Sequence, residues 1–173
     1  MNRVELHKGD ITKVKADAIV NAANNTLLGG GGVDGAIHRA AGSALLEYCK
    51  TLNGCNTGEA KISPGFKLPA KFIIHMVGPI WEGGEYNEDF LLASCYSNSF
   101  KLASKNNLKS ITFPSISTGI YRFPIARAAK IAIEETEKFL KGNVVIDKVI
   151  FVCFDDKTYN IYKNILHGEL SLS

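Results

Sequence analysis

The sequence predicts an α/β fold in which a mixed, mostly parallel sheet is covered by helices on both faces. Short apolar runs typical of buried strands alternate along the chain with longer segments of helical periodicity. Strands are expected at 4–6, 18–20, 57–63, 72–77, 111–114 and 148–154, and helices at 35–52, 88–106, 125–140 and 158–166. In such sheets ligands bind beyond the carboxyl ends of the strands. We therefore expect functional residues in the loops that follow strands.

The composition is that of an ordinary globular protein. Of the 173 residues 46% are hydrophobic and 21% are charged, and this length predicts a single domain over residues 1–173. A net charge of +3 is too small to indicate nucleic acid as a partner. No stretch reaches the ~18 apolar residues that a membrane span needs. Residues 1–6 lack an apolar signal run, so no membrane partner is expected.

Cysteine and histidine show none of the spacings typical of metal sites. With no secretory signal, we expect the cysteines to be reduced thiols in a cytoplasmic protein: Cys49, Cys55, Cys95 and Cys153. No His-Glu-x-x-His or comparable cluster occurs, so neither a metal nor a cofactor is predicted. His75 lies within a predicted strand and is interpreted as a satisfied core imidazole rather than a catalytic one.

Four consecutive glycines, Gly29 to Gly32, form the most unusual stretch of the chain. Such a run has no side chains to pack and carries a large backbone entropy cost, which indicates a use. The usual use is to let a ligand, above all a phosphate, approach bare backbone N–H groups. A helix follows at once, and Asp34 can cap it while placing a carboxylate at the rim of the anion pocket. A site for an anion needs no acidic side chain beside it, so the position of Asp34 indicates a chemical role for this carboxylate.

The same stretch formally matches the dinucleotide-binding fingerprint, Gly30-x-Gly32-x-x-Gly35. That fold needs its first glycine at the end of a strand and an acidic residue about 20 positions later, closing the next strand. Here residues 24–28 intervene, and the segment 43–52 that follows is helical in pattern. A P-loop is excluded because no Gly-Lys-Ser/Thr ending is present.

Polar side chains follow the first two predicted strands. Asp10 fits either a turn-forming cap or a carboxylate that accepts a hydrogen bond from a ligand. Asn21 is most simply interpreted as a group that satisfies buried backbone. Asn24 is a second asparagine a few residues before the glycine run, and this position favours a ligand contact.

A second unusual loop, residues 115–124, follows the strand at 111–114. Ser117 and Thr118 offer hydroxyls, Gly119 offers bare backbone, and a helix follows. Tyr121 and Phe123 offer flat apolar walls. The loop therefore has the parts of a second phosphate clamp.

The final strand ends at Phe154, which fits equally a core position or a cover for a base. Two glycine-bearing loops imply two phosphates, and the aromatic residues with Asp10 imply a base and sugars. The residues thus predict a nucleotide-diphosphate ligand.

These motifs resemble a known family, the macrodomains of the MacroD-type branch. The resemblance covers practically the whole chain, and its segments occur in the family's order: Gly9 to Thr12, Ile19 to Asn24, Gly29 to Gly42 and Pro114 to Gly119. The chain closely resembles bacterial stand-alone members known as O-acetyl-ADP-ribose deacetylases. It departs from the pattern at Arg122, because the family commonly has Gly after the loop tyrosine.

The resemblance implies a three-layer α/β/α fold that binds ADP-ribose. Asp10 would hold the adenine amino group, with Ile11 donating backbone beside it. Asn24 and Asp34 would stand at the distal ribose and carry the chemistry, with His38 orienting Asp34 from one helical turn away. The resemblance also places further residues in substrate binding: Asn21, Gly31, Gly32, Val33, Ser117, Thr118, Gly119, Ile120, Tyr121 and Phe154.

The implied reaction is hydrolysis of an ester on the distal ribose. Its substrates would be O-acetyl-ADP-ribose and ADP-ribose attached to Asp or Glu side chains of proteins. Asp34 would orient or deprotonate the attacking water while Asn24 fixes the ribose hydroxyls; alternatively, the bound pyrophosphate positions the water. A competing class is a non-catalytic ADP-ribose reader, and the acid after the glycine run favours the hydrolase. RNA binding through the base pocket has little support from the charge.

Overall fold

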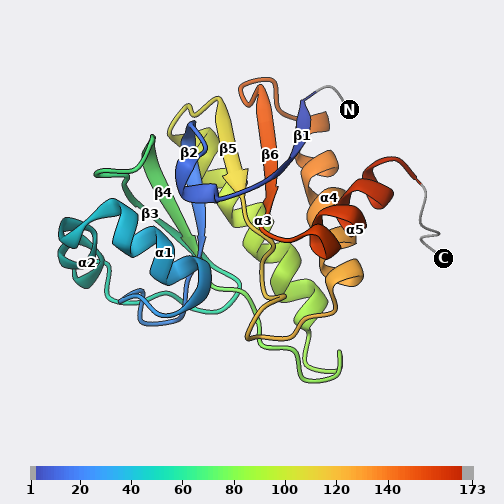
Figure 1. The fold of residues 1–173 in the computed structure, drawn as a ribbon, viewed down its shortest axis with the longest axis horizontal. Coiled ribbons are helices and arrows are strands. Elements are labelled where there is room, and N and C mark those ends of the chain that lie inside the picture. Colours follow the sequence, from blue (N-terminus) through green and yellow to red (C-terminus); the bar gives the residue numbers. More distant parts are fainter. Residues whose placement is uncertain (1–2, 169–173) are drawn as a thin grey trace.

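The computed structural model describes residues 3–168, which form a six-stranded sheet with helices on both faces (Figure 1). The strands are β1 (Val4–Lys8), β2 (Ala16–Ala22), β3 (Ala60–Pro64), β4 (Ala70–Met76), β5 (Ser110–Phe113) and β6 (Lys148–Cys153). They lie in the order β1-β6-β5-β2-β4-β3, and all neighbours are parallel except β3 and β4. The predicted mixed, mostly parallel sheet is confirmed.

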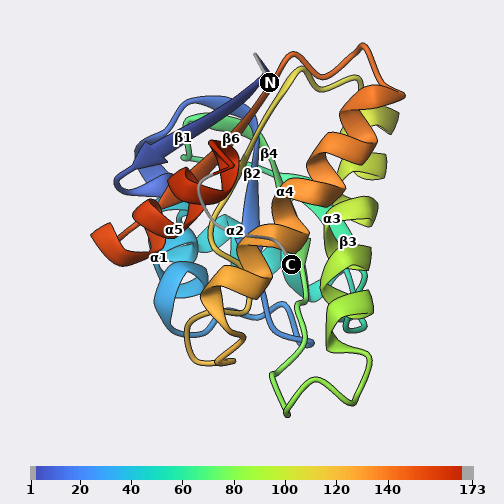
Figure 2. The same cartoon turned by 90° about the vertical axis from the view of Figure 1, so that its right-hand side faces the viewer.

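The helices form the two outer layers of the fold (Figure 1 and Figure 2). One face of the sheet carries the 3-10 helix η1 (Ile11–Lys13), α1 (Gly32–Ala41) and α2 (Ser43–Lys50). The other face carries α3 (Glu88–Lys105), α4 (Ile125–Lys141) and α5 (Asp156–Leu166). Each layer packs on the sheet through its own cluster of buried apolar side chains, so the three-layer α/β/α arrangement is confirmed.

The alternation of side chains along β2 decides which of its residues meet α1 and α2. Ala18 and Val20 belong to the apolar cluster of α3, α4 and α5, whereas Ile19 belongs to that of α1 and α2. Asn21, two residues after Ile19, therefore faces α1 and α2 as well. Its cross-strand partner is His75 of β4, so two polar side chains are buried next to each other beneath these helices.

The first helical segment differs from the sequence-based expectation in two respects. A single helix over 35–52 is wrong, because Gly42, with a φ of 91°, ends α1 and α2 begins at Ser43. The expectation that Asp34 caps the helix is also wrong, because Gly31 holds the N-cap position and Asp34 lies inside the first turn. The Asp34 side chain is consequently buried against the sheet instead of lying at the rim.

The loops that follow β2, β4 and β5 emerge at the same edge of the sheet, at the bottom of Figure 1. This is the edge at which the carboxyl ends of the parallel strands meet, where ligands bind in folds of this kind. Among the described helices none combines the length and apolar character needed to cross a membrane. Residues 1–2 and 169–173, which belong to the predicted domain 1–173, lie outside the described residues.

Candidate active site

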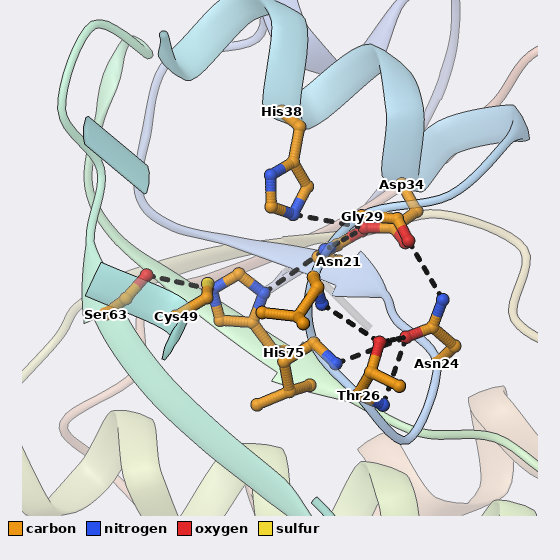
Figure 3. A network of polar contacts seen from close by, with 11 residues as sticks. Asn21, Asn24, Thr26, Gly29, Asp34, His38, Cys49, Ser63 and His75 are labelled. Carbon is orange, nitrogen blue, oxygen red and sulfur yellow. Dashed lines mark hydrogen bonds and ion pairs between the residues drawn. The ribbon is translucent and has the colours of Figure 1, made fainter. Parts of the chain in front are cut away.

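The loop between β2 and α1, residues 23–31 (the glycine loop), is held together by the side-chain amide of Asn24. Its Oδ1 accepts hydrogen bonds from the backbone N–H groups of Thr26 and Leu27, both at 3.2 Å, and from the Thr26 hydroxyl at 2.7 Å. Its Nδ2 donates to the Gly29 carbonyl at 3.0 Å (Figure 3). Asn24 is therefore first of all the hub of its own loop, with one N–H of Nδ2 left for a ligand.

Gly30 lets the side chains of Asn24 and Asp34 come together. A Cβ at Gly30 would lie 3.2 Å from Oδ2 of Asp34 and 3.4 Å from Nδ2 of Asn24. A Cβ at this position would press on the Asp34 carboxylate and touch the Asn24 amide, so the absence of a side chain leaves space between the two groups. The two residues predicted to carry the chemistry are thus brought together by the glycine between them.

The start of α1 presents bare backbone donors. Gly31 holds the N-cap position without any side-chain capping bond. Within the described residues, the N–H groups of Gly32, Val33 and Asp34 donate no hydrogen bond, as expected for the first turn of an uncapped helix. Gly31 and Gly32 are exposed, and a Cβ at either would meet open space. The helix dipole and these free donors make the segment a site for an anion.

Asp34 is a buried carboxylate, with 4% of the residue exposed. Its Oδ1 accepts a hydrogen bond from Nδ2 of Asn21 at 2.8 Å and lies 3.5 Å from Nε2 of His38. Burial raises the pKa of Asp34, while the Asn21 hydrogen bond and the charge of His38 act against that rise. A carboxylate with a raised pKa is better suited to accept a proton near neutral pH than an ordinary one.

The polar contacts continue beneath Asp34 into the core (Figure 3). Nδ2 of Asn21 lies 3.2 Å from Nδ1 of His75, and Nε2 of His75 lies 2.8 Å from the Ser63 hydroxyl. Burial lowers the pKa of His75 to about 3, so its ring is neutral. The interpretation of His75 as a satisfied core imidazole agrees with these contacts. Its link to Asn21 was missed in the sequence, because it depends on the register between β2 and β4.

The hydroxyls of the loop between β5 and α4, residues 114–124 (the second loop), differ from the sequence-based expectation. The Ser117 hydroxyl is buried, has no partner among the described residues, and packs so closely on Gly78 that a Cβ there would lie 2.1 Å from it. The Thr118 hydroxyl pairs with that of Ser115 at 2.7 Å. Packing against a strand-end glycine far along the chain has thus taken the Ser117 hydroxyl away from the loop surface.

The backbone of the second loop remains available. Among the described residues, the N–H groups of Gly119, Ile120 and Tyr121 donate no hydrogen bond. Ile120 is 81% exposed, and a Cβ at Gly119 would meet open space. The loop therefore presents peptide donors, rather than hydroxyls, for an anion.

The base end of the predicted ligand site lies at β1 and β6. Oδ1 of Asp10 accepts from the Thr12 N–H at 2.9 Å and the Thr12 hydroxyl at 2.7 Å, capping η1 and lowering the pKa of Asp10. The Gly9 N–H donates to the Cys153 carbonyl at 2.9 Å, so the ends of the two strands lie together. Phe154 is 84% exposed, which removes the core alternative for this ring. Asp10 keeps Oδ2 for a ligand while Oδ1 serves as the cap.

A groove of about 350 Å³ runs beside α1 from Gly30 to Leu46, with His38 and Arg39 along it. The groove shares Gly29 and Gly30 with the glycine loop, while Asp34 does not line it. Within residues 3–168 no cluster of three or more His, Cys, Asp or Glu side chains is arranged to hold a metal ion.

A comparison with protein families matches residues 20–132 to the Macro domain. The chain belongs to this family. The macrodomain resemblance drawn from the motifs is thereby confirmed. The matched range includes the glycine loop, α1 and the second loop, and leaves out β1 with Asp10 and β6 with Phe154.

Individual macrodomains are similar to the chain over nearly its whole length. A macro domain-containing protein of Methanosarcina mazei is 59% identical, over 96% of this chain and 89% of that protein. Human ADP-ribose glycohydrolase MACROD2 is 54% identical, over 98% of this chain but only 40% of its own length. A mutant Oceanobacillus iheyensis macrodomain, whose structure was solved with ADPR (ADP-ribose), is 47% identical to this chain in sequence. The two structures match with a TM-score of 0.91 over 95% of this chain and 92% of that one.

Proposed function

We propose that this macrodomain binds ADP-ribose and hydrolyses an ester on its distal ribose. The observation that carries the proposal is the meeting of Asn24 and the buried Asp34 across Gly30, directly beside the free N–H groups that open α1. The related O. iheyensis macrodomain with ADPR and the relative named as a glycohydrolase support the ligand and the reaction type. We further propose O-acetyl-ADP-ribose and proteins mono-ADP-ribosylated on Asp or Glu as substrates.

The ligand would lie along the carboxyl edge of the sheet. Its adenine would face Asp10, the backbone beside Ile11, and the exposed ring of Phe154. Its pyrophosphate would lie between the free backbone donors of the two loops, those of residues 32–34 and 119–121. The distal ribose would then reach Asn24 and Asp34.

The proposed step is a hydrolysis. The oxygen of a water attacks the ester carbon, and a proton of the water passes to Asp34 or, in the alternative route, towards the pyrophosphate. The bond to the ribose oxygen then breaks, and this oxygen takes up the proton to become a hydroxyl. The products are a carboxylic acid and free ADP-ribose. Asp34 is suited to the proton because burial raises the pKa of its carboxyl. A carboxylate beside a pyrophosphate is unfavourable before reaction, which is expected of a group retained for the transition state.

The decisive experiment measures hydrolysis and binding on the same variants. Asp34→Ala should lower single-turnover hydrolysis of O-acetyl-ADP-ribose and of mono-ADP-ribosylated protein by about 10²-fold or more, the scale of a positioned general base. Its affinity for ADP-ribose by calorimetry should stay similar or improve. Glu47→Ala, which removes an exposed carboxylate of α2, is the matched control and should leave both unchanged.

Two outcomes would overturn the assignment. Wild-type turnover by Asp34→Ala, or equal losses of binding and hydrolysis, would remove Asp34 from the chemistry. Tight binding of ADP-ribose without any turnover by the wild-type protein would establish the alternative function, a reader module.

A further inference from the structure

The contacts beneath Asp34 form a buried chain across three strands and one helix. It runs from Ser63 of β3 through His75 of β4 and Asn21 of β2 to Asp34 of α1, with separations of 2.8, 3.2 and 2.8 Å between the interacting atoms (Figure 3). All four residues are buried, and Asn21 and His75 are the next-to-last residues of β2 and β4, beneath Asp34. The chain therefore acts on the site through the position of Asp34.

Asn21 is the link whose orientation decides what Asp34 meets. Its Nδ2 has two acceptors, Oδ1 of Asp34 and Nδ1 of His75, and so uses both of its hydrogens. Its Oδ1 is buried with no partner among the described residues. No hydrogen bond to Oδ1 thus holds the Asn21 amide in its orientation. A rotation of the amide by 180° would exchange Oδ1 with Nδ2 and put Oδ1 2.8 Å from the Asp34 carboxylate.

The protonation of the His75 ring selects between these two orientations. The Ser63 hydroxyl lies 2.8 Å from Nε2 of His75 and 3.2 Å from the Pro64 carbonyl. When its single hydrogen goes to that carbonyl, the hydroxyl oxygen is left to accept from Nε2–H of His75. In a neutral ring with its hydrogen on Nε2, Nδ1 carries a bare lone pair and accepts from Asn21. If the hydrogen were on Nδ1 instead, the Nδ1–H group of His75 and the Nδ2–H group of Asn21 would both be donors and would point at each other.

We propose that His75 is a positioning residue for Asp34: the bare Nδ1 of its neutral ring holds the Asn21 amide so that Nδ2 donates to the Asp34 carboxylate. The proposal rests on the proposed hydrolysis and names a residue of that same site. His75 touches no ligand, and its effect passes through Asn21. Ser63 fixes the ring in the required tautomer.

The direction of the effect follows from the groups that face Asp34. They include Asn21 from β2, Asn24 from the glycine loop, His38 from its own helix, and Cys49 of α2. Cys49 is a buried thiol that also lies 3.9 Å from Nε2 of His75. Burial raises the Cys49 pKa to about 11, so this group is uncharged at neutral pH. The Asn21 hydrogen bond is thus the main support of the ionised Asp34, and its loss should raise the pKa of Asp34 further.

The test uses two replacements of His75 that differ in which ring nitrogen they imitate. His75→Asn keeps an acceptor at the place of Nδ1, whereas His75→Gln keeps a polar group only at the place of Nε2. His75→Gln should lower kcat on the order of tenfold or more with KM within about twofold, as a displaced catalytic group does. The acid limb of its kcat–pH profile should move to higher pH, because Asp34 must be ionised to accept the proton. His75→Asn should stay close to wild type in both.

A second measurement does not depend on hydrolysis. Nitrogen NMR of the wild-type His75 ring should show a protonated Nε2 and a bare Nδ1, and carbon NMR should show the Asp34 carboxyl titrating at higher pH in His75→Gln than in His75→Asn. If the wild-type enzyme proves inactive, the proposed function fails and the titrations alone decide the role of His75. A wild-type acid limb and Asp34 titration in His75→Gln would overturn the proposal, as would equal losses in both variants or a hydrogen on Nδ1.

Discussion

The glycine loop and the second loop present similar backbone donors to the same edge of the sheet, yet they are built differently. The glycine loop is organised by one polar side chain, Asn24, which makes hydrogen bonds to three other residues. The second loop is held by two buried apolar residues, Ile116 and Phe123, and by backbone bonds. One of these bonds, from Trp81 N–H to the Tyr121 carbonyl at 2.8 Å, ties it to the loop after β4.

The difference extends to backbone strain. In the second loop Ser117 and Arg122 have φ of 63° and 60°, in the left-handed region that favours glycine. In the glycine loop and the first turn of α1, two of the residues with positive φ are glycines, Gly29 and Gly32, and Leu27 is the exception. The glycine loop thus has its conformation specified at low cost beside the catalytic candidates. The second loop stores strain where only peptide groups are offered to the ligand.

The largest expected effect tests the feature that the two loops share, their backbone donors for the pyrophosphate. Gly31→Glu and Gly119→Glu place a side chain and a negative charge at the two proposed pyrophosphate contacts. Both glycines have open space at the Cβ position, so the fold should survive. Calorimetry should show ADP-ribose binding weakened by about 10²-fold or more, the loss of a few hydrogen bonds to a charged group.

Gly31→Ala and Gly119→Ala are the matched controls. Neither glycine has a positive φ, so alanine fits both positions and binding should change by only a few-fold. If one Glu variant binds ADP-ribose like wild type, the loop that carries it does not contact the phosphates. The two loops would then share only the geometry of their backbone donors.

The next prediction tests whether the glycine loop depends on a polar side chain for its stability more than the second loop does. Asn24→Ala removes the hub of the glycine loop and should lower the free energy of unfolding by about 1–3 kcal/mol, while slowing hydrolysis about tenfold or more. Thr118→Val removes only the contacts of the Thr118 hydroxyl with the hydroxyl and the carbonyl of Ser115 and should cost within about 1 kcal/mol. Thermal unfolding and single-turnover hydrolysis measure both.

Adding Asp34→Ala to Asn24→Ala should slow hydrolysis by less than the product of the single effects, because both act on one ribose and one water. Equal stability losses in Asn24→Ala and Thr118→Val would show that the glycine loop does not depend on its amide. The contrast between the loops would then be wrong.

The sequence predicted the layers and the two loops because strands and helices alternate with clear periodicity, and because a four-glycine run has few uses. It did not predict the break at Gly42, since a single glycine after two alanines is compatible with a continuous helix. The buried hydroxyl of Ser117 and the bond from Asn21 to His75 depend on contacts between residues far apart in the chain. The loop-forming role of Asn24 could have been predicted from the sequence, because an Asn side chain often accepts a hydrogen bond from the backbone two residues on.

The smallest effect tests the strain in the second loop at the position where this chain departs from the MacroD-type pattern. Arg122 has a φ of 60°, and its N–H donates to the Gly119 carbonyl at 3.0 Å, so it keeps a conformation that suits Gly. Arg122→Gly removes a left-handed penalty of about 1–2 kcal/mol and adds freedom to the unfolded chain worth about 0.5–1 kcal/mol. The net gain of up to about 1.5 kcal/mol should raise Tm by up to about 6 °C.

Arg122→Ala separates backbone strain from charge, because it removes the guanidinium and keeps the left-handed φ. Its Tm should stay near wild type or fall slightly, and scanning calorimetry resolves the difference from Arg122→Gly. Affinity for ADP-ribose should remain within about twofold in both, since the proposed contacts are peptide N–H groups of other residues. An equal rise in Tm for both variants would assign the effect to charge. Arg122 would then carry no more backbone strain than the glycines of the glycine loop do.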